Sequence, residues 1–447
     1  MPISPARTAA FEILLRVEQE DSYASELLHS ARCAELSPPD QSLTTELVMG
    51  VLRWRSLLDA SIAKVAAQAL ARLDREVLTA LRMGAYQLGW LDRVPARAAI
   101  HESVELVKRA RKRSAAPFAN AVLRKLTDTS IPFEARQELI AAAANPDRLA
   151  AASAHPSWLV QRWTSQYGIE MARHICMYDQ SIPITSIRLR AASAQEELRQ
   201  EGIEIAPGNF LADAQRVVAG DVTKTKAFSD GRVTIQDEAS QLVAALVGRA
   251  KRVLDCCAAP GGKTWAIADR NPDAEIVAVE LHRHRAEMLR KRVLASNVRV
   301  IQADIRDLPR GETFDCVLVD APCSGTGTIA RNPEIKWRLK PEDLSDLHAR
   351  QGAILRSAMK HVALAGMLIY STCSLEREEG EGVVEEAMQD NQSFRLMDIR
   401  SHLEALRSAA GFVAQDLESL IHGSYLRTIP GVHLCDGFFV AMLQRIE

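Results

Sequence analysis

Residues 1–130 carry apolar positions at helical spacing, and no stretch of them alternates as a strand would. Residues 6–18, for example, place Ala10, Ile13, Leu14 and Val17 on one helical face. The same periodicity runs through residues 43–57, 62–70, 75–88 and 98–109, and Pro38, Pro39 and Pro95 are expected to mark loops between such segments. The pattern predicts an all-α bundle at the N-terminal end.

Residues 131–240 mix two patterns. Residues 184–189 alternate as a strand, residues 194–201 have helical spacing, and short strand-like pieces follow as far as Val233. We therefore expect a linker and a small α/β module over residues 131–240.

From residue 241 to residue 447, short apolar runs are separated by helical or loop segments. The runs are residues 252–257, 275–280, 298–304, 314–320 and 366–372. Continuous apolar strands separated by helices predict a doubly wound, mainly parallel sheet. The apolar run at residues 437–443 is expected to form a last strand, with antiparallel pairing as one option.

The composition limits which classes of protein are possible. A chain of 447 residues, 47% hydrophobic and 25% charged, is typical of a soluble protein with two or three domains. No apolar run is long enough to span a membrane and no secretion signal is visible, so we expect a cytoplasmic protein with no membrane partner. The 8 cysteines show no CxxC or zinc-ligand spacing, so reduced thiols and no metal are expected.

The formal net charge of −2 requires a local basic patch if the partner is a nucleic acid. One basic run lies where a helix is expected to end, and a second group of basic residues comes late in the chain. Each residue can bind a phosphate of the nucleic acid, or it can equally be a solvated surface charge. Trp337 can stack on a base, although core packing is the more common role of such a residue. The basic candidates are Lys108, Arg109, Arg111, Lys112, Arg113, Arg331, Lys336 and Arg338.

A glycine-containing loop, residues 255–264 with the sequence DCCAAPGGKT, follows the first strand of the sheet. Its glycines allow a ligand to approach the backbone, and the helix after it offers free N–H groups. A phosphate-binding P-loop would need glycine where Cys257 stands, and the dinucleotide pattern GxGxxG is absent. The loop therefore suits a different ligand in a nucleotide-type crevice.

Four acidic residues end the first four strands: Asp255, Glu280, Asp304 and Asp320. One such residue alone is more often a helix cap, but ligands of these sheets bind at the carboxyl ends of strands. Glu280 is placed to bind ribose hydroxyls, and Asp304 to lie near an adenine amino group. The acidic rim suits adenosine with a cationic tail and would repel a triphosphate.

Two cysteines, Cys323 and Cys373, follow the fourth and fifth strands and are expected at the mouth of this crevice. A thiolate that adds to carbon 6 of cytosine makes carbon 5 electron-rich enough to accept a methyl group. Asp320, protonated or sharing a proton, can hydrogen-bond nitrogen 3 of the ring. The remaining cysteines that we interpret as small buried apolar groups are Cys33, Cys176, Cys256, Cys316 and Cys435.

The motifs LDCCAAPGGKT, DAPCSGTGT, NPEIKW and YSTCS, with TIQDEAS and IPGVHLCDGFFVAML, resemble those of RNA cytosine-5 methyltransferases of the Nol1/Nop2/Sun family over residues 155–447. The helical N-terminal region resembles the RNA-binding factor NusB. Together they imply a NusB-like RNA-binding domain at 1–130, an RNA-binding module within 131–240 and a Rossmann-like methyltransferase domain at 241–447. The implied cofactor is S-adenosyl-L-methionine. The implied partner is 16S ribosomal RNA before small-subunit assembly is complete, bound by a monomer.

The resemblance also implies roles for single residues. It makes Cys373 the nucleophile, links Cys323 to product release and places Asp320 beside them as a catalytic residue. Relatives often read Glu-Glu-Asn-Glu after the nucleophile, whereas residues 378–381 are Glu-Glu-Gly-Glu here. The implied cofactor contacts are Cys257, Ala258, Ala259, Pro260, Gly261, Gly262, Lys263, Glu280, Asp304 and Asp320.

Three alternatives stay open at this point. Transfer RNA is a second candidate substrate. A non-enzymatic NusB-like antitermination factor would bind RNA without binding the cofactor. A P-loop NTPase is disfavoured by Cys257 and by the acidic rim.

Overall fold

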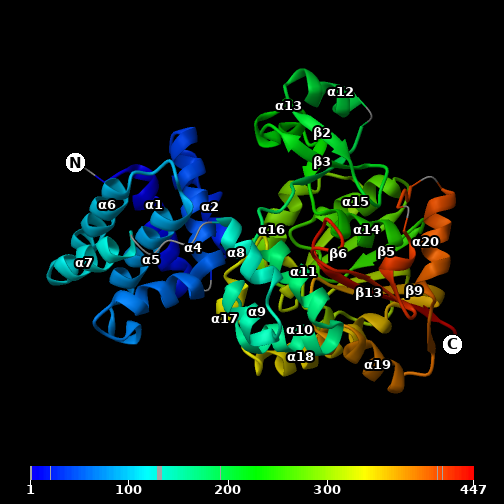
Figure 1. Ribbon diagram of the computed structural model, residues 1–447. Coiled ribbons are helices and arrows are strands. Elements are labelled where there is room, and N and C mark those ends of the chain that lie inside the picture. The colour runs from blue at the N-terminus through cyan, green and yellow to red at the C-terminus, as the bar shows by residue number, and fades with distance from the viewer. Residues whose placement is uncertain (1–2, 21, 128–132, 192, 410, 415) are drawn as a thin grey trace. The chain divides into compact units, whose positions relative to one another are not determined.

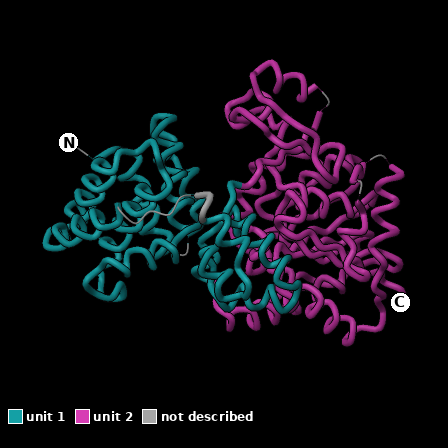
Figure 2. Tube along the Cα trace, in the orientation of Figure 1, with its two compact units in different colours: residues 1–182, 329–338 teal, residues 183–328, 339–447 magenta. Residues whose placement is uncertain are grey.

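The computed structural model describes residues 3–20, 22–127, 133–191, 193–409, 411–414 and 416–447. The chain divides into two compact units (Figure 2): unit 1 is residues 1–182 and 329–338, and unit 2 is residues 183–328 and 339–447. The domain boundary expected between residues 130 and 131 falls within residues 128–132, which lie outside the described residues.

The described residues from 3 to 127 form helices and turns and contain no strand, as the periodicity predicts (Figure 1). Apolar residues such as Leu47, Val48 and Leu58 are buried between these helices, because helical spacing puts them on one face. The main helices are α1 (Pro5–Gln19), α4 (Pro38–Val65), α5 (Arg75–Trp90), α6 (Ala96–Arg109) and α7 (Ala116–Leu126), with the short helices α2 (Ala24–Leu28) and α3 (Ala31–Ala34).

Two details of this bundle differ from the prediction. The helical pattern over residues 62–70 is helical only as far as Val65, where α4 ends. Pro38 and Pro39 are the first two residues of α4 and do not lie in a loop, whereas Pro95 lies in the loop before α6, as predicted, and is the N-cap residue of that helix. Proline is tolerated there because the first N–H groups of a helix have no intrahelical partner to lose.

The rest of unit 1 contains four more helices and a segment from late in the chain. The helices are α8 (Phe133–Ala141), α9 (Pro146–Ala152), α10 (Ser157–Tyr167) and α11 (Ile169–Asp179). The late segment is residues 329–338, which includes α17 (Ile335–Arg338). It follows the DAPCSGTGT motif directly in the sequence.

Unit 2 begins with the small α/β module predicted before the larger sheet. Its antiparallel sheet has the order β2-β3-β1-β4, and its core contains Ile187, Leu198 and Val233. The elements are β1 (Ser186–Leu189), α12 (Ser193–Gln200), β2 (Glu204–Pro207), β3 (Ala214–Ala219), α13 (Lys226–Ser229) and β4 (Val233–Ile235).

The main sheet of unit 2 has the order β11-β12-β13-β9-β8-β5-β6-β7, with β10 paired to β13. The pairs among β5–β9 are parallel, whereas β13 runs antiparallel to β9. The sheet is therefore mixed and mainly parallel in its central part. The strands are β5 (Arg252–Asp255), β6 (Glu275–Glu280), β7 (Val298–Gln302), β8 (Phe314–Asp320), β9 (Val362–Thr372), β10 (Phe394–Leu396), β11 (Ile421–His422), β12 (Tyr425–Thr428) and β13 (Phe438–Arg445).

Helices cover both faces of this sheet, as a doubly wound fold requires. Successive strand residues point to opposite faces, so Val253 packs in one apolar core and Leu254 in the other. The first core includes α14 (Glu238–Leu246), α15 (Gly262–Arg270) and α20 (Ile399–Ser408), and the second includes α18 (Asp343–Met359) and α19 (Glu381–Gln389). Helix α16 (Arg283–Arg292) follows β6. The carboxyl ends of β5–β9 consequently meet at one edge of the sheet, where all the predicted site residues of unit 2 lie.

Within the described chain, no helix combines the length and the apolar character that crossing a bilayer requires.

Candidate active site

The two predicted cysteines are in contact. Strands β8 and β9 pair in parallel as far as Asp320 opposite Ser371, and each chain turns away into a loop from there. The Sγ atoms of Cys323 and Cys373 lie 3.3 Å apart, a hydrogen-bonding separation for two sulfur atoms. Both side chains are half-buried. The register of two neighbouring strands thus brings together thiols that are 50 positions apart in sequence.

The two thiols differ from the other cysteines in their surroundings. The hydrogen bond with Cys373, followed by burial, raises the pKa of Cys323 well above its usual range. A thiol whose pKa is raised in this way stays protonated at neutral pH. Burial alone dominates at Cys256 and Cys435, whose thiol pKa values are raised as expected for small apolar groups in a core.

Asp320 lies between a lysine and a serine. Its Oδ2 atom is 2.7 Å from the Nζ atom of Lys263, and its Oδ1 atom accepts a hydrogen bond of 2.8 Å from the hydroxyl of Ser371. Burial lowers the pKa of Lys263, but the adjacent Asp320 carboxylate outweighs it, so the net shift is upward. The Lys263–Asp320 pair therefore places an ammonium group and a carboxylate at the ends of the two strands that precede the cysteines.

The glycine loop connects β5 to α15 and contains the predicted cofactor residues 257–263. Gly261 has φ of 104° and is the N-cap residue of α15. A Cβ atom there would lie 2.7 Å from Leu289 Cδ1, so both the backbone conformation and the packing require glycine. Beside the loop, Thr264 donates a 2.7 Å hydrogen bond to Asp255 Oδ2.

Asp255 is a buried carboxyl group with one unused oxygen. Its pKa is raised to about 6, chiefly by burial, although the Thr264 hydrogen bond opposes the shift. The Oδ1 atom is buried and has no hydrogen-bond partner within the described protein. Such an atom is costly unless a ligand group satisfies it.

Glu280 ends β6, as the strand pattern predicts. Asp304 was expected to end the next strand, but β7 ends at Gln302 and Asp304 is the N-cap residue of the short 3₁₀ turn that follows. Glu280 is buried, and its Oε1 atom accepts a hydrogen bond of 2.9 Å from the backbone N–H of His282. Asp304 is hydrogen-bonded by Arg306 at both carboxylate oxygens, which lowers its pKa. An adenine amino group would have to share Asp304 with that guanidinium.

This set of groups fits S-adenosyl-L-methionine. The unpartnered oxygen of Asp255 and the carboxylate of Glu280 are acceptors suited to a cationic, hydroxyl-bearing ligand. The donors at the start of α15 suit its carboxylate. The chemistry of the rim is therefore compatible with the cofactor predicted from sequence.

Two of the basic RNA-contact candidates, Lys336 and Arg338, have structural roles in unit 1, and Trp337 between them also packs there, the more common role expected of it. Lys336 is 1% exposed, and its Nζ atom donates to the backbone oxygens of Arg53 and Ala154 at 2.8 and 2.9 Å. Trp337 Nε1 donates to the carbonyl of Leu52 at 2.6 Å. Arg338 donates to two backbone carbonyls of the same unit, at 2.6 and 2.5 Å. All three side chains donate to backbone carbonyls of unit 1, a role that residue type alone does not reveal.

The N-terminal basic run divides into paired and unpaired cations. Lys108 pairs with Glu105, Arg109 with Glu12 and Lys112 with Asp74, at 2.7, 3.4 and 3.1 Å respectively. Arg111 and Arg113 are exposed, and no ion pair involves them among the described residues. These two arginines remain the most available phosphate-binding groups of the run.

Sequence reasoning missed a set of side chains that joins the two cysteine loops. Glu379 is fully buried and accepts hydrogen bonds from Ser324, Ser374 and Gln351. The sequence offered one signal, the Glu-Glu-Gly-Glu stretch at residues 378–381 where relatives often read Glu-Glu-Asn-Glu, but nothing in it marks Glu379 as buried.

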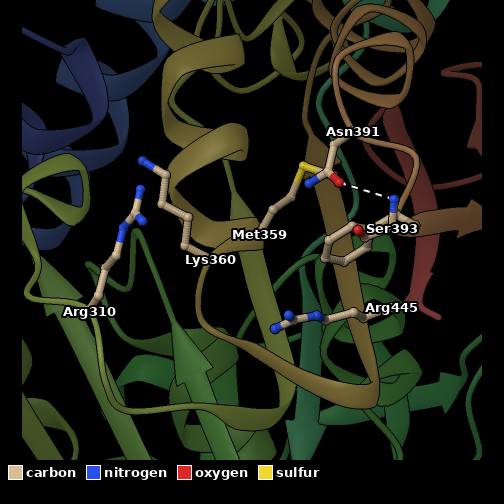
Figure 3. Close-up of a pocket in the computed structure, with 7 residues that line it drawn as sticks. Arg310, Met359, Lys360, Asn391, Ser393 and Arg445 are labelled. Carbon is tan, nitrogen blue, oxygen red and sulfur yellow. Dashed lines mark hydrogen bonds between the residues drawn. The ribbon is translucent and has the colours of Figure 1, made fainter. Parts of the chain in front are cut away.

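A separate pocket of about 260 Å³ lies at the opposite ends of β8 and β9 (Figure 3). Arg310, Lys360 and Arg445 line it, but the guanidinium of Arg445 already donates to the carbonyls of Val362 and Glu447. None of the predicted site residues lines this pocket. Among the residues that the structure describes, no group of three or more His, Cys, Asp and Glu side chains is arranged to hold a metal ion.

Comparison with known proteins agrees with this geometry. The model of the family described as 16S rRNA methyltransferase RsmB/F matches residues 246–444, and that of the NusB family matches residues 4–128. The chain is 33% identical to the probable ribosomal RNA small subunit methyltransferase B of Bacillus subtilis (strain 168), over 100% of both chains. It is 32% identical to the ribosomal RNA small subunit methyltransferase B of Pseudomonas syringae pv. tomato, over 91% of this chain and 90% of the relative. The crystal structure of PH0851 shares the fold, with a TM-score of 0.79 at 22% identity over 100% of both chains.

Proposed function

This chain belongs to the RsmB/F family of 16S rRNA methyltransferases, and from that premise we propose that it methylates carbon 5 of a cytosine in 16S ribosomal RNA through a covalent bond to Cys373. The observation that carries the proposal is the 3.3 Å contact between Cys323 and Cys373 at the ends of two parallel strands. A methyltransferase acting on an amino group or a hydroxyl has no use for two adjoining thiols.

In the proposed reaction the sulfur of Cys373 adds to carbon 6 of the cytosine. The electron pair of the 5,6 double bond moves toward carbon 5, which becomes the nucleophile. S-adenosyl-L-methionine supplies a methyl group that is electrophilic because it is attached to a sulfonium. After transfer, loss of the carbon 5 proton to a base restores the double bond and expels the Cys373 sulfur.

Cys323 is suited to assist the last stage. Its thiol keeps its proton because of the Cys373 hydrogen bond and burial, and it lies next to the sulfur that must leave. We assign to Cys323 the release of the methylated product.

Lys263 and Asp320 can stabilise the ring while carbon 6 is attacked. Nitrogen 3 of cytosine is a hydrogen-bond acceptor, so a bare carboxylate would repel it. The ammonium of Lys263, 2.7 Å from Asp320, can provide the proton that this contact needs. Lys263 thereby acts at the ring as well as in the cofactor loop.

The remaining proposed cofactor contacts follow from the geometry of the sheet edge. Residues 257–263 supply backbone groups at the start of α15. Glu280 supplies a carboxylate for the ribose, and Asp304 an acceptor for adenine, shared with Arg306.

We propose that residues 1–130 and the module within 131–240 bind the RNA, and that residues 241–447 transfer the methyl group. The NusB-family match over residues 4–128 supports the first assignment, and the RsmB/F match over residues 246–444 supports the last.

The direct test uses radiolabelled S-adenosyl-L-methionine with unmodified 16S RNA and, in parallel, unmodified transfer RNA. The account predicts label in 16S RNA, recovered as 5-methylcytosine after digestion to nucleosides. Label in transfer RNA alone would support the alternative substrate. Cofactor binding without any transfer, or RNA binding without cofactor binding, would contradict the proposal.

A further inference from the structure

The pairing of the two thiols depends on contacts beyond the sheet. The ladder between β8 and β9 ends with Asp320 opposite Ser371, and the backbone N–H of Ala321 makes one more bond to the carbonyl of Ser371 at 2.9 Å. The cysteines follow two and three positions later, where strand pairing no longer fixes their separation. Beyond the ladder, one backbone hydrogen bond of 3.0 Å joins the loops, from the N–H of Gly327 to the carbonyl of Cys373, and it does not involve the backbone next to Cys323. Side-chain contacts add the remaining links between the two loops.

A single carboxylate contacts both loops. Glu379 Oε1 accepts a hydrogen bond from the backbone N–H of Ser324 at 2.8 Å, immediately after Cys323. Glu379 Oε2 accepts a hydrogen bond from the hydroxyl of Ser374 at 2.5 Å, immediately after Cys373, and another from the hydroxyl of Ser324. The residue after each cysteine is thus bonded to the same side chain.

Two further residues hold Glu379 in place. Gln351 on α18 donates one amide hydrogen bond to Glu379 Oε1 at 2.8 Å and another to the carbonyl of Pro322 at 2.9 Å. The hydroxyl of Tyr370 donates to the backbone carbonyl of Glu379 at 2.8 Å. The carboxylate, the glutamine and the tyrosine are all fully buried, so solvent does not compete for these bonds.

We propose that Glu379 is the positioning residue of this site: its carboxylate clamps the Cys323 loop to the Cys373 loop and so keeps the two sulfur atoms in contact. It reaches neither thiol in the described contacts and acts through Ser324 and Ser374. The expected effect of the clamp on catalysis rests on the proposed function. The clamp itself can be measured without methyl transfer.

The geometric test measures how readily the two thiols form a disulfide. Diamide accepts the two protons and two electrons that the thiols lose and becomes the hydrazine, while a bond forms between the sulfurs. The rate of the Cys323–Cys373 bridge is followed by peptide mass mapping in the full chain. We expect E379A to slow bridge formation at least tenfold, with E379Q intermediate because its amide still accepts one of the bonds.

Two further variants separate the clamp from general instability. E238Q is the matched control, because Glu238 is equally buried and accepts three backbone hydrogen bonds from residues 209–211. It should lower the melting temperature without slowing the bridge. S374A removes one arm of the clamp and should slow the bridge even if E379A does not fold.

Methyl transfer and ligand binding are then measured on the same variants. E379Q should lower kcat while KM for RNA and Kd for S-adenosyl-L-methionine stay within twofold, because the clamp touches neither ligand. Bridge formation at the wild-type rate in folded E379A and S374A would overturn the inference. Wild-type protein that forms the bridge but methylates no RNA would instead contradict the proposed function and leave the clamp standing.

Discussion

The buried carboxyl group of Asp255 should make the stability of the fold depend on pH. Its pKa rises from 3.8 to about 6 because burial disfavours the charged form. The folded state therefore holds this proton more tightly than the unfolded state. Stability from this group is fully present below pH 3.8 and is lost as pH rises through about 6.

D255N should consequently stabilise the protein without cofactor at pH 8, by up to about 3 kcal/mol at roughly 1.36 kcal/mol for each pKa unit. The asparagine oxygen can still accept the Thr264 hydrogen bond. The stability that D255N gains over wild type should shrink as pH falls from 7 to 4. Thermal melts of both proteins across this pH range measure it. A gain that does not change with pH would contradict the assigned cause.

Residue type and position predict the proposed reacting groups better than the groups that hold them. The positions of Asp320, Cys323 and Cys373 were predictable because Asp320 ends β8 and the cysteines lie in the loops after β8 and β9, at the edge of the sheet where ligands bind. Glu379 was not, because its partner Ser324 is 55 positions away and only the folded chain reveals the contact. Lys336 was misassigned to the surface because nothing in the sequence marks the backbone carbonyls that accept its hydrogen bonds.

At the scale of elements, residues 329–338 belong to unit 1, and Lys336 is buried within it. Burial lowers the pKa of Lys336 from 10.5 to about 7, and the charge of Asp179 only partly offsets it. The other ionisable groups around Lys336 are Arg53, which opposes its charge, and Cys176, with the neutral His155 nearby. Because the unfolded state binds this proton more tightly, the free energy of unfolding should rise with pH between about 7 and 10.5.

K336M should therefore flatten that rise, while lowering stability at high pH, because the carbonyl of Ala154 loses the Lys336 donor and the carbonyl of Arg53 keeps only its other bond, from Gln180. Denaturant titrations of wild type and variant at pH 7 and pH 9.5 measure the difference. K125M, at an exposed lysine of α7, is the control and should keep the wild-type slope. A K336M slope equal to that of wild type would show that the lysine is not the titrating group.

The elements themselves were largely predictable because their apolar periods are clear. The parallel order of β5–β9 and the antiparallel β13 follow from short apolar runs and from one late strand. Helix ends were less predictable. Pro38 was expected in a loop, yet it is the first residue of α4. A proline does not distinguish the two places, because neither a loop nor the first turn of a helix needs its missing N–H group.

At the scale of the whole molecule, a chain with net charge −2 needs concentrated positive charge to bind RNA. R111Q/R113Q should weaken RNA binding and reduce the slope of log affinity against log salt by about one to two, as expected when roughly one phosphate contact is lost for each arginine. K108Q/R109Q is the matched control, and its effect should be smaller because Lys108 and Arg109 already pair with carboxylates. Equal effects of the two double variants would remove Arg111 and Arg113 from the RNA-binding assignment.

The central claim is that Cys373 bonds to the RNA base and that Cys323 lets it leave. The most direct measurement mixes C323S with unmodified 16S RNA and S-adenosyl-L-methionine and then separates the products by denaturing gel electrophoresis. The account predicts a stable protein–RNA adduct with C323S, little with wild type and none with C323S/C373A. An adduct that persists in C323S/C373A, or full methyl transfer by C373A, would contradict it.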